Sequence, residues 1–321
     1  MIENRINWVD NSPRFHFSKL TFVIVFNKSG NVPEFKSSAF RGGIGQMLLR
    51  MFCVCPEKQE SECEKCMCRG RCIVQNIMYA PFRIKPVYVT EKESAGFTLY
   101  CGDARPSVKK CDRIALEMVL FGDMISFFYP ILQAIHMLGM EGLGHDRIPF
   151  SVERVENRHG DAIVDGMDIH NDRILLEDSV EYLQSRRNEL GLGDETESIR
   201  IDFSAPCEIK HHGNTMKRFE PEAVLAAVER RARMYSMFEG VDPGDPIEYE
   251  IPEQFSESSH NVIAKRHSGR QREDIKLRGI RGWMEIRGAK KEAVDLLIMG
   301  EITGIGKNTK FGFGKYTVSR C

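Results

Sequence analysis

A glycine-rich segment near the end of the chain combines the residue types that bind phosphate. Its glycines and lysines are Gly304, Gly306, Lys307, Lys310, Gly312, Gly314 and Lys315. Glycine permits positive φ angles and a close approach of the backbone to a bulky partner. Successive N–H groups in such a loop can form an anion-binding nest, and the lysines add positive charge. The segment therefore predicts a phosphate site, with a glycine-rich hairpin that binds nothing as the alternative.

Two common phosphate motifs do not fit this segment. A Walker A loop needs Gly-x4-Gly-Lys-Ser/Thr, but Glu301 occupies the first glycine position and Asn308 follows Lys307. The dinucleotide fingerprint needs a third glycine where Thr309 stands, at the first turn of a βαβ unit. Here the segment instead follows a predicted helix and precedes a predicted strand. This order favours an RNA-handling ferredoxin-like fold over a nucleotide-binding one.

A second group of chemically active residues is a cluster of cysteines. Six lie within twenty residues, at Cys53, Cys55, Cys63, Cys66, Cys68 and Cys72. Cys63-x2-Cys66 has zinc-knuckle spacing, and Cys53 or Cys55 together with Cys72 would complete a tetrahedral site. We choose Cys53, Cys63, Cys66 and Cys72 as ligands of a structural zinc, because a closed four-cysteine site leaves no position open for catalysis. An iron–sulfur cluster, redox-active cysteines or unliganded thiols are the alternatives.

Charge is distributed unevenly along the chain. The net charge of all 321 residues is −1, yet residues 260–321 contain 14 lysines and arginines against 6 acidic residues. A basic portion on an acidic body indicates a localised phosphate-binding surface. No basic segment followed by an apolar run opens the sequence, and charges and a proline interrupt the longest apolar run, residues 114–140. We therefore expect a cytoplasmic protein with reduced thiols and no membrane contact.

The elements that must position these residues follow from apolar periodicity. In the first half we expect strands at 20–27, 82–90, 96–101, 113–121 and 149–155, and helices at 39–51 and 125–138. Ser37 or Ser38 is expected to cap the first helix. The three glycines in that helix, at 42, 43 and 45, each cost about 1 kcal/mol relative to alanine. Close passage of backbone or RNA would account for them.

The second half repeats this outline. Strands are expected at 198–203, 261–266, 276–287 and 314–318, and helices at 221–238 and 289–299, with Gly240 as a C-cap. Polar and acidic residues between the halves predict an exposed connection, with one short strand at 173–176. The predicted organisation is α+β, with domains at 1–158 and 197–321, a connection at 159–196 and a cysteine-rich insertion at 53–72.

Four blocks together resemble the CRISPR precursor-RNA processing endoribonucleases, the sixth Cas family of the RAMP superfamily. They are Phe40-Arg41-Gly42, Leu120-Phe121-Gly122 through Gly142-Leu143-Gly144, the block from Arg266 to Gln271, and the C-terminal Gly-x-Gly-x5-Gly-x-Gly. Their order and spacing agree over nearly the whole chain. The resemblance implies two tandem ferredoxin-like domains of the RAMP or RRM-like type. It also implies metal-independent cleavage of CRISPR repeat RNA in precursor crRNA, in which a ribose 2′-OH attacks the adjacent phosphate and leaves a 2′,3′-cyclic phosphate.

Such chemistry needs a base, a proton donor and cations around the phosphate. Histidine suits the first two roles, but the first helix, where many members of the family carry one, has none. We favour His267 as the catalytic residue, with Arg266 beside it, and His145 in a glycine-rich turn as second choice; His16 and the pair His211 and His212 are further candidates. Cleavage by lysine and arginine alone is an alternative.

Residues expected to bind RNA are Arg41, Arg270, Gly304, Gly306, Lys307, Lys310, Gly312 and Gly314. The aromatic residues Trp283, Phe311, Phe313 and Tyr316 could stack on unpaired bases. The predicted partner is CRISPR repeat RNA. The alternative function is that of a non-catalytic RAMP subunit, which binds guide RNA beside the other subunits of a CRISPR effector complex.

Overall fold

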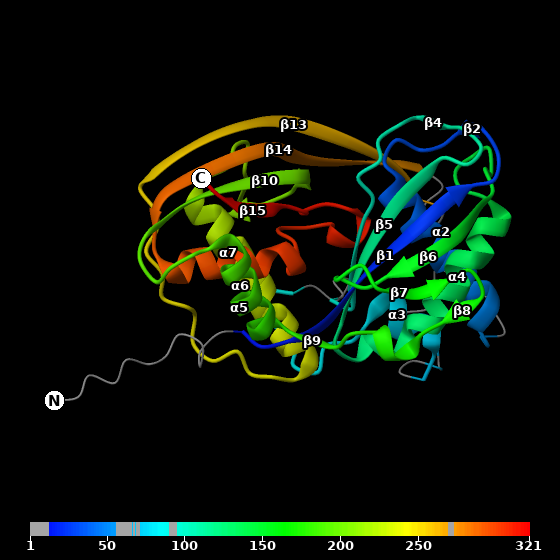
Figure 1. The fold of residues 1–321 in the computed structure, drawn as a ribbon, viewed down its shortest axis with the longest axis horizontal. Helices are drawn as coiled ribbons and strands as arrows, with labels where there is room; N and C mark the ends of the chain where they lie inside the picture. Colours follow the sequence, from blue (N-terminus) through cyan, green and yellow to red (C-terminus); the bar gives the residue numbers. More distant parts are fainter. Residues whose placement is uncertain (1–12, 56–65, 67, 69–70, 90–94, 269–272) are drawn as a thin grey trace.

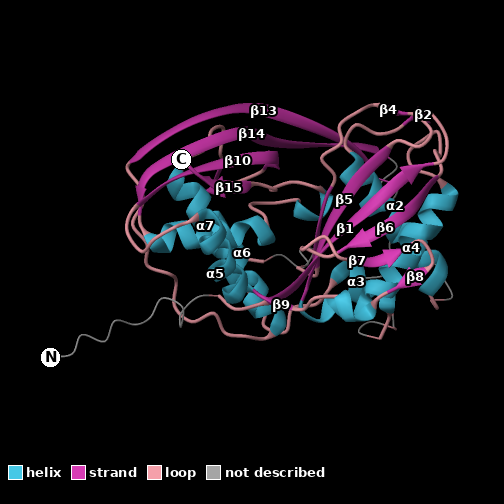
Figure 2. Cartoon of the chain, in the orientation of Figure 1, coloured by secondary structure: helices cyan, strands magenta, loops and turns pink. Residues whose placement is uncertain are grey.

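Two antiparallel sheets organise the chain (Figure 1). The structure is a computed structural model and describes residues 13–55, 66, 68, 71–89, 95–268 and 273–321; the side chains of 266–268 and 273–274 are not described. The first sheet is built from the first half of the chain and the second sheet from the second half (Figure 2). The predicted mixture of helices and antiparallel sheets is confirmed.

The first sheet is built around β1 (His16–Phe26), whose apolar run predicted a buried strand. β1 pairs with β5 (Arg113–Phe121) on one side and β6 (Phe150–Glu156) on the other, and β3 (Phe97–Tyr100) lies beyond β5. The helices α2 (Lys36–Phe52), α3 (Ile73–Tyr79) and α4 (Phe128–Glu141) complete this half. A 3-10 turn, Gly122–Phe127, precedes α4 and places Pro130 in the first helical turn, where proline is tolerated.

The second sheet has the strand order β13-β14-β10-β15. Its strands are β10 (Glu197–Cys207), β13 (Gln254–Ser268), β14 (Glu273–Ala289) and β15 (Thr317–Arg320). α6 (Pro221–Glu239) and α7 (Lys291–Thr303) lie below this sheet in Figure 1. In both sheets the first strand lies between the strands that are third and fourth in chain order, so the two halves share one topology.

The segment between the halves is more ordered than its polar composition predicted. β7 (Ala162–Asp165) and β8 (Asp168–Ile169) extend the first sheet, and β9 (Glu177–Asp178) pairs with the start of β1. α5 (Ser179–Leu190) follows, with the Asp178 carboxylate accepting from two N–H groups of its first turn. The predicted strand at 173–176 is wrong, because Arg173 ends a 3-10 turn and an extended link follows. The strands β7, β8 and β9 are only two to four residues long, too short for a period to show in the sequence.

Two further local predictions are wrong. Residues 82–89 form turns rather than a strand, because Pro81 and Pro86 lack the N–H groups that a sheet needs. Ser37 and Ser38 lie inside α2 rather than at its cap, which is Phe35 without any side-chain cap bond. The hydroxyl of Ser37 instead accepts from the N–H of Cys101, 2.9 Å away. It therefore ties α2 to the end of β3.

One continuous cluster of buried apolar residues spans both halves. At its centre, Phe121 of the first half stacks on Tyr235 of α6, with ring centroids 3.7 Å apart. Tyr182 of α5 donates to the Glu301 carboxylate of α7 at 2.9 Å. The halves are therefore fixed against each other by buried contacts. No helix in the described part of the chain is both long and apolar enough to cross a membrane.

The helical glycines provide a test of these packing contacts. In α2, a Cβ added to Gly42 would have no other atom within 4 Å, whereas a Cβ on Gly139 of α4 would lie 2.3 Å from the Phe150 carbonyl oxygen. We predict that Gly42→Ala raises the free energy of unfolding by about 1 kcal/mol through helix propensity. Gly139→Ala gains the same helix propensity but should lower the free energy of unfolding, because the backbone at Phe150 must move to make room for the new Cβ. Urea unfolding of the two variants measures both, and a shift of the same sign in each would contradict the packing described.

Candidate functional site

The glycine-rich segment predicted from the sequence adopts the backbone for which glycine is needed. Gly304, Gly306, Gly312 and Gly314 all have positive φ, between 67° and 89°. A Cβ on Gly306 would lie 2.3 Å from the carbonyl oxygen of Glu208. One on Gly314 would lie 2.1 Å from that of Ile305. These glycines are therefore required by the fold of the segment itself.

The N–H groups of the segment bond mainly to the protein. Ile305 donates to the carbonyl of Gly314, Gly314 to that of Pro206, and Lys307 to that of Glu208, each at 2.9 Å. Gly304, Gly312 and Gly314 are also buried. These three glycines shape the segment from inside, and their contact with RNA stays a prediction. The side chain of Lys307 is exposed.

A buried arginine holds the segment from the inside. Arg231 of α6 is 7% exposed. Its guanidinium donates to the carbonyl oxygens of Thr303 at 2.9 Å and Gly306 at 3.3 Å, and to the hydroxyl of Thr309 at 3.0 Å. A buried charge is stable only when its donors are paired. The segment supplies those partners and is itself fixed by them.

The outer turn of the segment docks on the first half of the chain. Gly312 approaches Ser37 of α2 so closely that a Cβ would lie 2.3 Å from the serine side chain. The Lys310 ammonium lies 4.9 Å from the ring centroid of Phe97, and the Arg41 guanidinium lies 5.0 Å from that of Phe311. Both are within the range of cation–π contact. Arg41 and Lys310, predicted to bind RNA, therefore also join the two halves.

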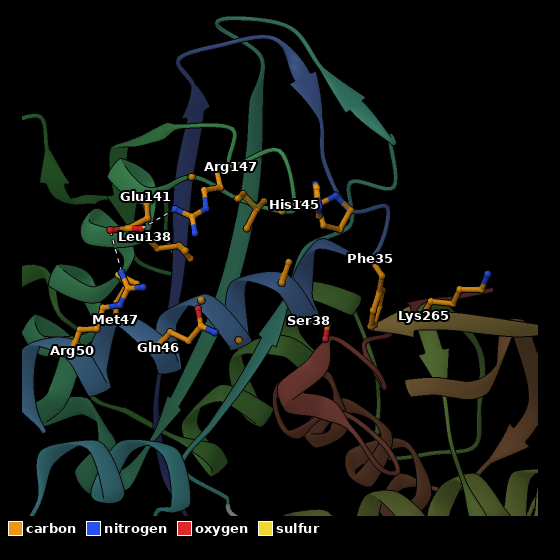
Figure 3. A pocket seen from close by; sticks show the side chains of 17 residues that line it. Phe35, Ser38, Gln46, Met47, Arg50, Leu138, Glu141, His145, Arg147 and Lys265 are labelled. Atoms are coloured by element: carbon orange, nitrogen blue, oxygen red, sulfur yellow. Dashed lines mark ion pairs between the residues drawn. The ribbon is translucent and has the colours of Figure 1, made fainter. Parts of the chain in front are cut away.

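A groove of about 620 Å³ opens beside this junction (Figure 3). Its walls come from α2, the end of α4, the turn before β6, the loop at residues 33–35 and the end of β13. The lining side chains labelled in Figure 3 are Phe35, Ser38, Gln46, Met47, Arg50, Leu138, Glu141, His145, Arg147 and Lys265. The groove is therefore built from both halves of the chain.

Cationic groups dominate the charge of this groove. Arg50 lies 3.1 Å from the Glu141 carboxylate, and Arg147 lies 3.8 Å from its other oxygen. Lys265 adds a further exposed ammonium from β13. The His145 ring is fully exposed, with Nδ1 3.3 Å from the Asp146 carboxylate. The lining thus contains one carboxylate, three cationic side chains and one imidazole, which suits a phosphodiester.

The favoured catalytic residues continue directly from the groove. Arg266 and His267 follow Lys265 in β13, where they pair in register with Ile275 and Asp274. Their side chains lie outside the described residues, as does all of Arg270. By backbone position the structure brings the end of β13 to the same groove as His145. His16 lies elsewhere, with Nδ1 2.9 Å from the Glu239 carboxylate.

The face of α2 that lines the groove follows a four-residue repeat in the sequence that our sequence analysis did not identify. Gly42, Gln46 and Arg50 recur every four residues along α2, so they lie on one helical face, and all three are exposed. Gly43 faces Leu138 and Gly45 faces Met78, which explains two of the three helical glycines as close packing. Gly42 has no such neighbour. It leaves the helix backbone open toward the groove.

The aromatic residues predicted to stack on bases differ in exposure. Tyr316 is fully buried and donates to the Leu297 carbonyl at 2.6 Å. Phe313 is 2% exposed. The prediction of base stacking is wrong for Tyr316, which is buried in the core. Phe311 and Phe313 alternate with glycines, and of these two it is Phe313 that takes the core position. Trp283 is half-buried, with the Arg200 guanidinium 4.5 Å from its ring centroid.

The cysteine cluster is only partly described. Cys63 lies outside the described residues, whereas Cys53, Cys66 and Cys72 are half-buried. Cys53 and Cys72 pack against the apolar core. Within the described ranges, no three cysteine thiols lie within 4.8 Å of one another. Four thiolates at this spacing match the donor set that zinc prefers, and their grouping remains a prediction.

Comparisons with known proteins give two matching family models. Residues 15–178, more than half of the chain, match the N-terminal domain AF_1859_N. Residues 201–316 match CRISPR-associated endoribonuclease Cas6. No curated protein sequence matches this chain.

Solved structures share the fold at low sequence identity. Thermus thermophilus Cas6 has a TM-score of 0.52 at 14% identity, covering 95% of this chain and 98% of that one. A Cas6 product complex has a TM-score of 0.51 at 15% identity, with 94% and 98% covered. A chain of a partial Cas6-RT-Cas1–Cas2 complex has a TM-score of 0.55 at 8% identity, covering 97% of this chain and 47% of that one.

The role of Arg231 can be tested by its removal. Arg231→Met keeps the length of the side chain but leaves the carbonyls of Thr303 and Gly306 without their donor. We predict a loss of about 3 kcal/mol in the free energy of unfolding, because buried polar groups lose their partners. Arg233→Met on the same helix is the control, since half-exposed Arg233 bonds the carbonyls of a surface loop. Urea unfolding should show a much smaller loss for the control, and equal losses would contradict the assigned role.

Proposed function

We propose that the chain, whose residues 201–316 match the model of CRISPR-associated endoribonuclease Cas6, belongs to that family and cleaves CRISPR repeat RNA in precursor transcripts. The groove between α2, the His145 turn and the end of β13 holds the scissile phosphate. The observation that carries this assignment is that Arg50, Arg147, Lys265 and the exposed imidazole of His145 line one groove. The family match supports the reaction, and the groove supports its place in the molecule.

The proposed chemistry is attack of a ribose 2′-OH on the adjacent phosphorus. The 2′-oxygen forms a new bond to phosphorus, the bond to the 5′-oxygen breaks, and the products are a 2′,3′-cyclic phosphate and a 5′-OH. A base removes the 2′ proton and an acid protonates the leaving oxygen. His145 lines the groove and is one proposed acid or base. His267, whose backbone follows Lys265 by two residues in β13, is the other. No metal ion takes part in this scheme.

Cationic side chains stabilise the charge that develops on the phosphoryl oxygens. Arg50 and Arg147 flank Glu141, which holds both guanidinium groups in the groove without neutralising their combined charge. Arg266, Arg270 and Lys307 are further proposed RNA contacts; the side chain of Lys307 is exposed on the glycine-rich segment. The open backbone at Gly42 gives the RNA a place for close approach.

Two structural features complete the proposal. The shared strand order of the two sheets supports two tandem ferredoxin-like domains. Cys53, Cys63, Cys66 and Cys72 are the proposed ligands of a structural zinc, and their spacing and the half-buried positions of three of them support it. Zinc at this place would fix the link between α2 and α3. It takes no part in cleavage.

The proposed cleavage is tested with the host's CRISPR repeat RNA in the presence of EDTA. We predict a single cut with a 2′,3′-cyclic phosphate on the upstream product. His267→Ala and His145→Ala should each be compared with His260→Ala, an exposed histidine on the same strand as His267. Loss of a general acid or base lowers the single-turnover rate by about 10²- to 10⁴-fold. The control should cleave at the wild-type rate.

Binding of the repeat without any cut, over hours and across a range of pH, would overturn the enzyme assignment in favour of a guide-RNA-binding subunit. Full rates in both histidine variants would instead remove the groove as the site of acid–base catalysis. Cleavage that stops in EDTA and returns with added metal would contradict the metal-independent scheme.

The zinc proposal predicts one tightly bound zinc per chain in protein purified without added metal. Cys66→Ser and Cys72→Ser should each lower the zinc content and the melting temperature, because zinc binding contributes to folding. Cys111→Ser is the control, since this exposed thiol lies outside the cluster. Elemental analysis and thermal unfolding measure both effects. Zinc content that is unchanged in the two cluster variants would overturn the ligand assignment.

A further inference from the structure

A second group of possible metal ligands lies away from both the groove and the cysteines. His211 ends the short strand β11 (Lys210–His211), which forms a hairpin with β12 (Asn214–Thr215). His212 follows in the turn. Glu222 projects from the first turn of α6. Within the described part of the chain, these three side chains are the group whose ligand atoms all lie within 4.8 Å of one another.

The distances between the ligand atoms leave room for a shared ion. Nε2 of His211 lies 3.9 Å from Oε1 of Glu222, and Nε2 of His212 lies 3.8 Å from the same oxygen. Both separations are too long for hydrogen bonds. Two donors on one tetrahedral ion, each about 2.0–2.1 Å from the metal, stand roughly 3.3 Å apart. Small side-chain rotations would close the observed gaps to that value.

The backbone presents the two imidazoles together. His212 and Gly213 have φ angles of 46° and 78°, which are the signs of a tight hairpin turn with two left-handed residues. Asparagine and glycine are favoured at such positions, so histidine at 212 is an unusual choice for the turn alone. The rings of His211 and His212 lie with centroids 4.0 Å apart. The turn therefore directs two neighbouring rings to the same side.

The opposite ligand is held by a rigid helix start. Pro221 occupies the first position of α6, where its fixed φ suits the helix. The Glu222 side chain is 52% exposed and that of His212 is 78% exposed, so an ion can enter from solvent. The His211 side chain is only 14% exposed. His211 is thus packed against the protein, whereas His212 and Glu222 lie on the solvent side of the group.

We propose that His211, His212 and Glu222 bind a divalent transition metal of the zinc class. Two imidazole nitrogens and one carboxylate oxygen are a donor set that suits such ions. Three protein ligands leave the remaining coordination position to water, so the ion exchanges with solvent. The site is separate from the proposed nuclease groove and from the cysteine cluster.

The site is linked to the glycine-rich segment through a short stretch of backbone. Glu208, three residues before His211, accepts from the Lys307 N–H at 2.9 Å. Its carboxylate accepts from the Asn308 amide at 2.8 Å. Ile209 accepts from the N–H of Met216, which closes the base of the hairpin at 2.9 Å. Metal binding would therefore fix the hairpin against α6 and, through Glu208, against the segment that joins the two halves.

The experiment is a titration of the chelator-treated full chain with Co²⁺, followed by absorption spectroscopy. Cobalt bound to thiolates shows strong charge-transfer absorption, whereas cobalt bound to imidazole and carboxylate shows only weak visible bands. We expect the wild type to bind one equivalent of Co²⁺ that shows only the weak visible bands. His212→Asn should weaken that binding by about tenfold or more. This variant retains the turn, because asparagine followed by glycine is the favoured pair there.

Glu222→Gln should weaken cobalt binding as His212→Asn does, while Glu220→Gln and His260→Asn are controls that should bind as the wild type. The melting temperature without metal should be unchanged or higher for His212→Asn, and its rise on adding Co²⁺ should be reduced. A wild type with only thiolate-type absorption would overturn the proposal. The proposal would also be overturned if the His212→Asn variant still bound one equivalent of Co²⁺ with weak visible bands and with the affinity of the wild type.

Discussion

The arrangement of this molecule depends on the buried guanidinium of Arg231. Its donors need partners away from water, and the carbonyls of Thr303 and Gly306 and the hydroxyl of Thr309 provide them. The chain can bend around this group only with left-handed residues, which is why the segment carries glycines with positive φ. Once fixed in this way, the segment presents its outer turn to α2 and β3. An internal polar network therefore sets the position of one half of the chain against the other.

The groove follows from that docking. Its histidine turn and both arginines belong to the first half, and Lys265 and the end of β13 belong to the second. Neither half alone supplies all the residues that line the groove. Stability of the junction and function of the groove are therefore coupled, because a change that loosens the glycine-rich segment also moves Lys265 relative to His145.

The two proposed metal sites would act on different parts of this arrangement. A zinc ion held by four cysteines would fix the link between two helices of the first half. An ion held by His211, His212 and Glu222 would fix a hairpin of the second half, next to the strand end that holds Lys307. Neither ion lies in the proposed groove. Both would act by limiting backbone motion and not by activating a nucleophile.

The sequence alone determined the elements whose causes are local. The apolar run of β1 and the proline and glycine limits of α6 depend on near neighbours. The family resemblance was also visible, because its blocks are ordered along the chain. The two-residue strand β9 was missed, since it is too short to show a period and its partner, β1, lies far away in the sequence.

Only the tertiary structure decided which residues share a site. It buried Gly304, Gly312, Gly314 and Tyr316, which the sequence had offered to RNA, because their neighbours come from elsewhere in the chain. It also joined His145 to the end of β13 across 120 residues of sequence. Residue type and spacing fix what chemistry a side chain can perform. Long-range packing fixes whether water, protein or a substrate meets it.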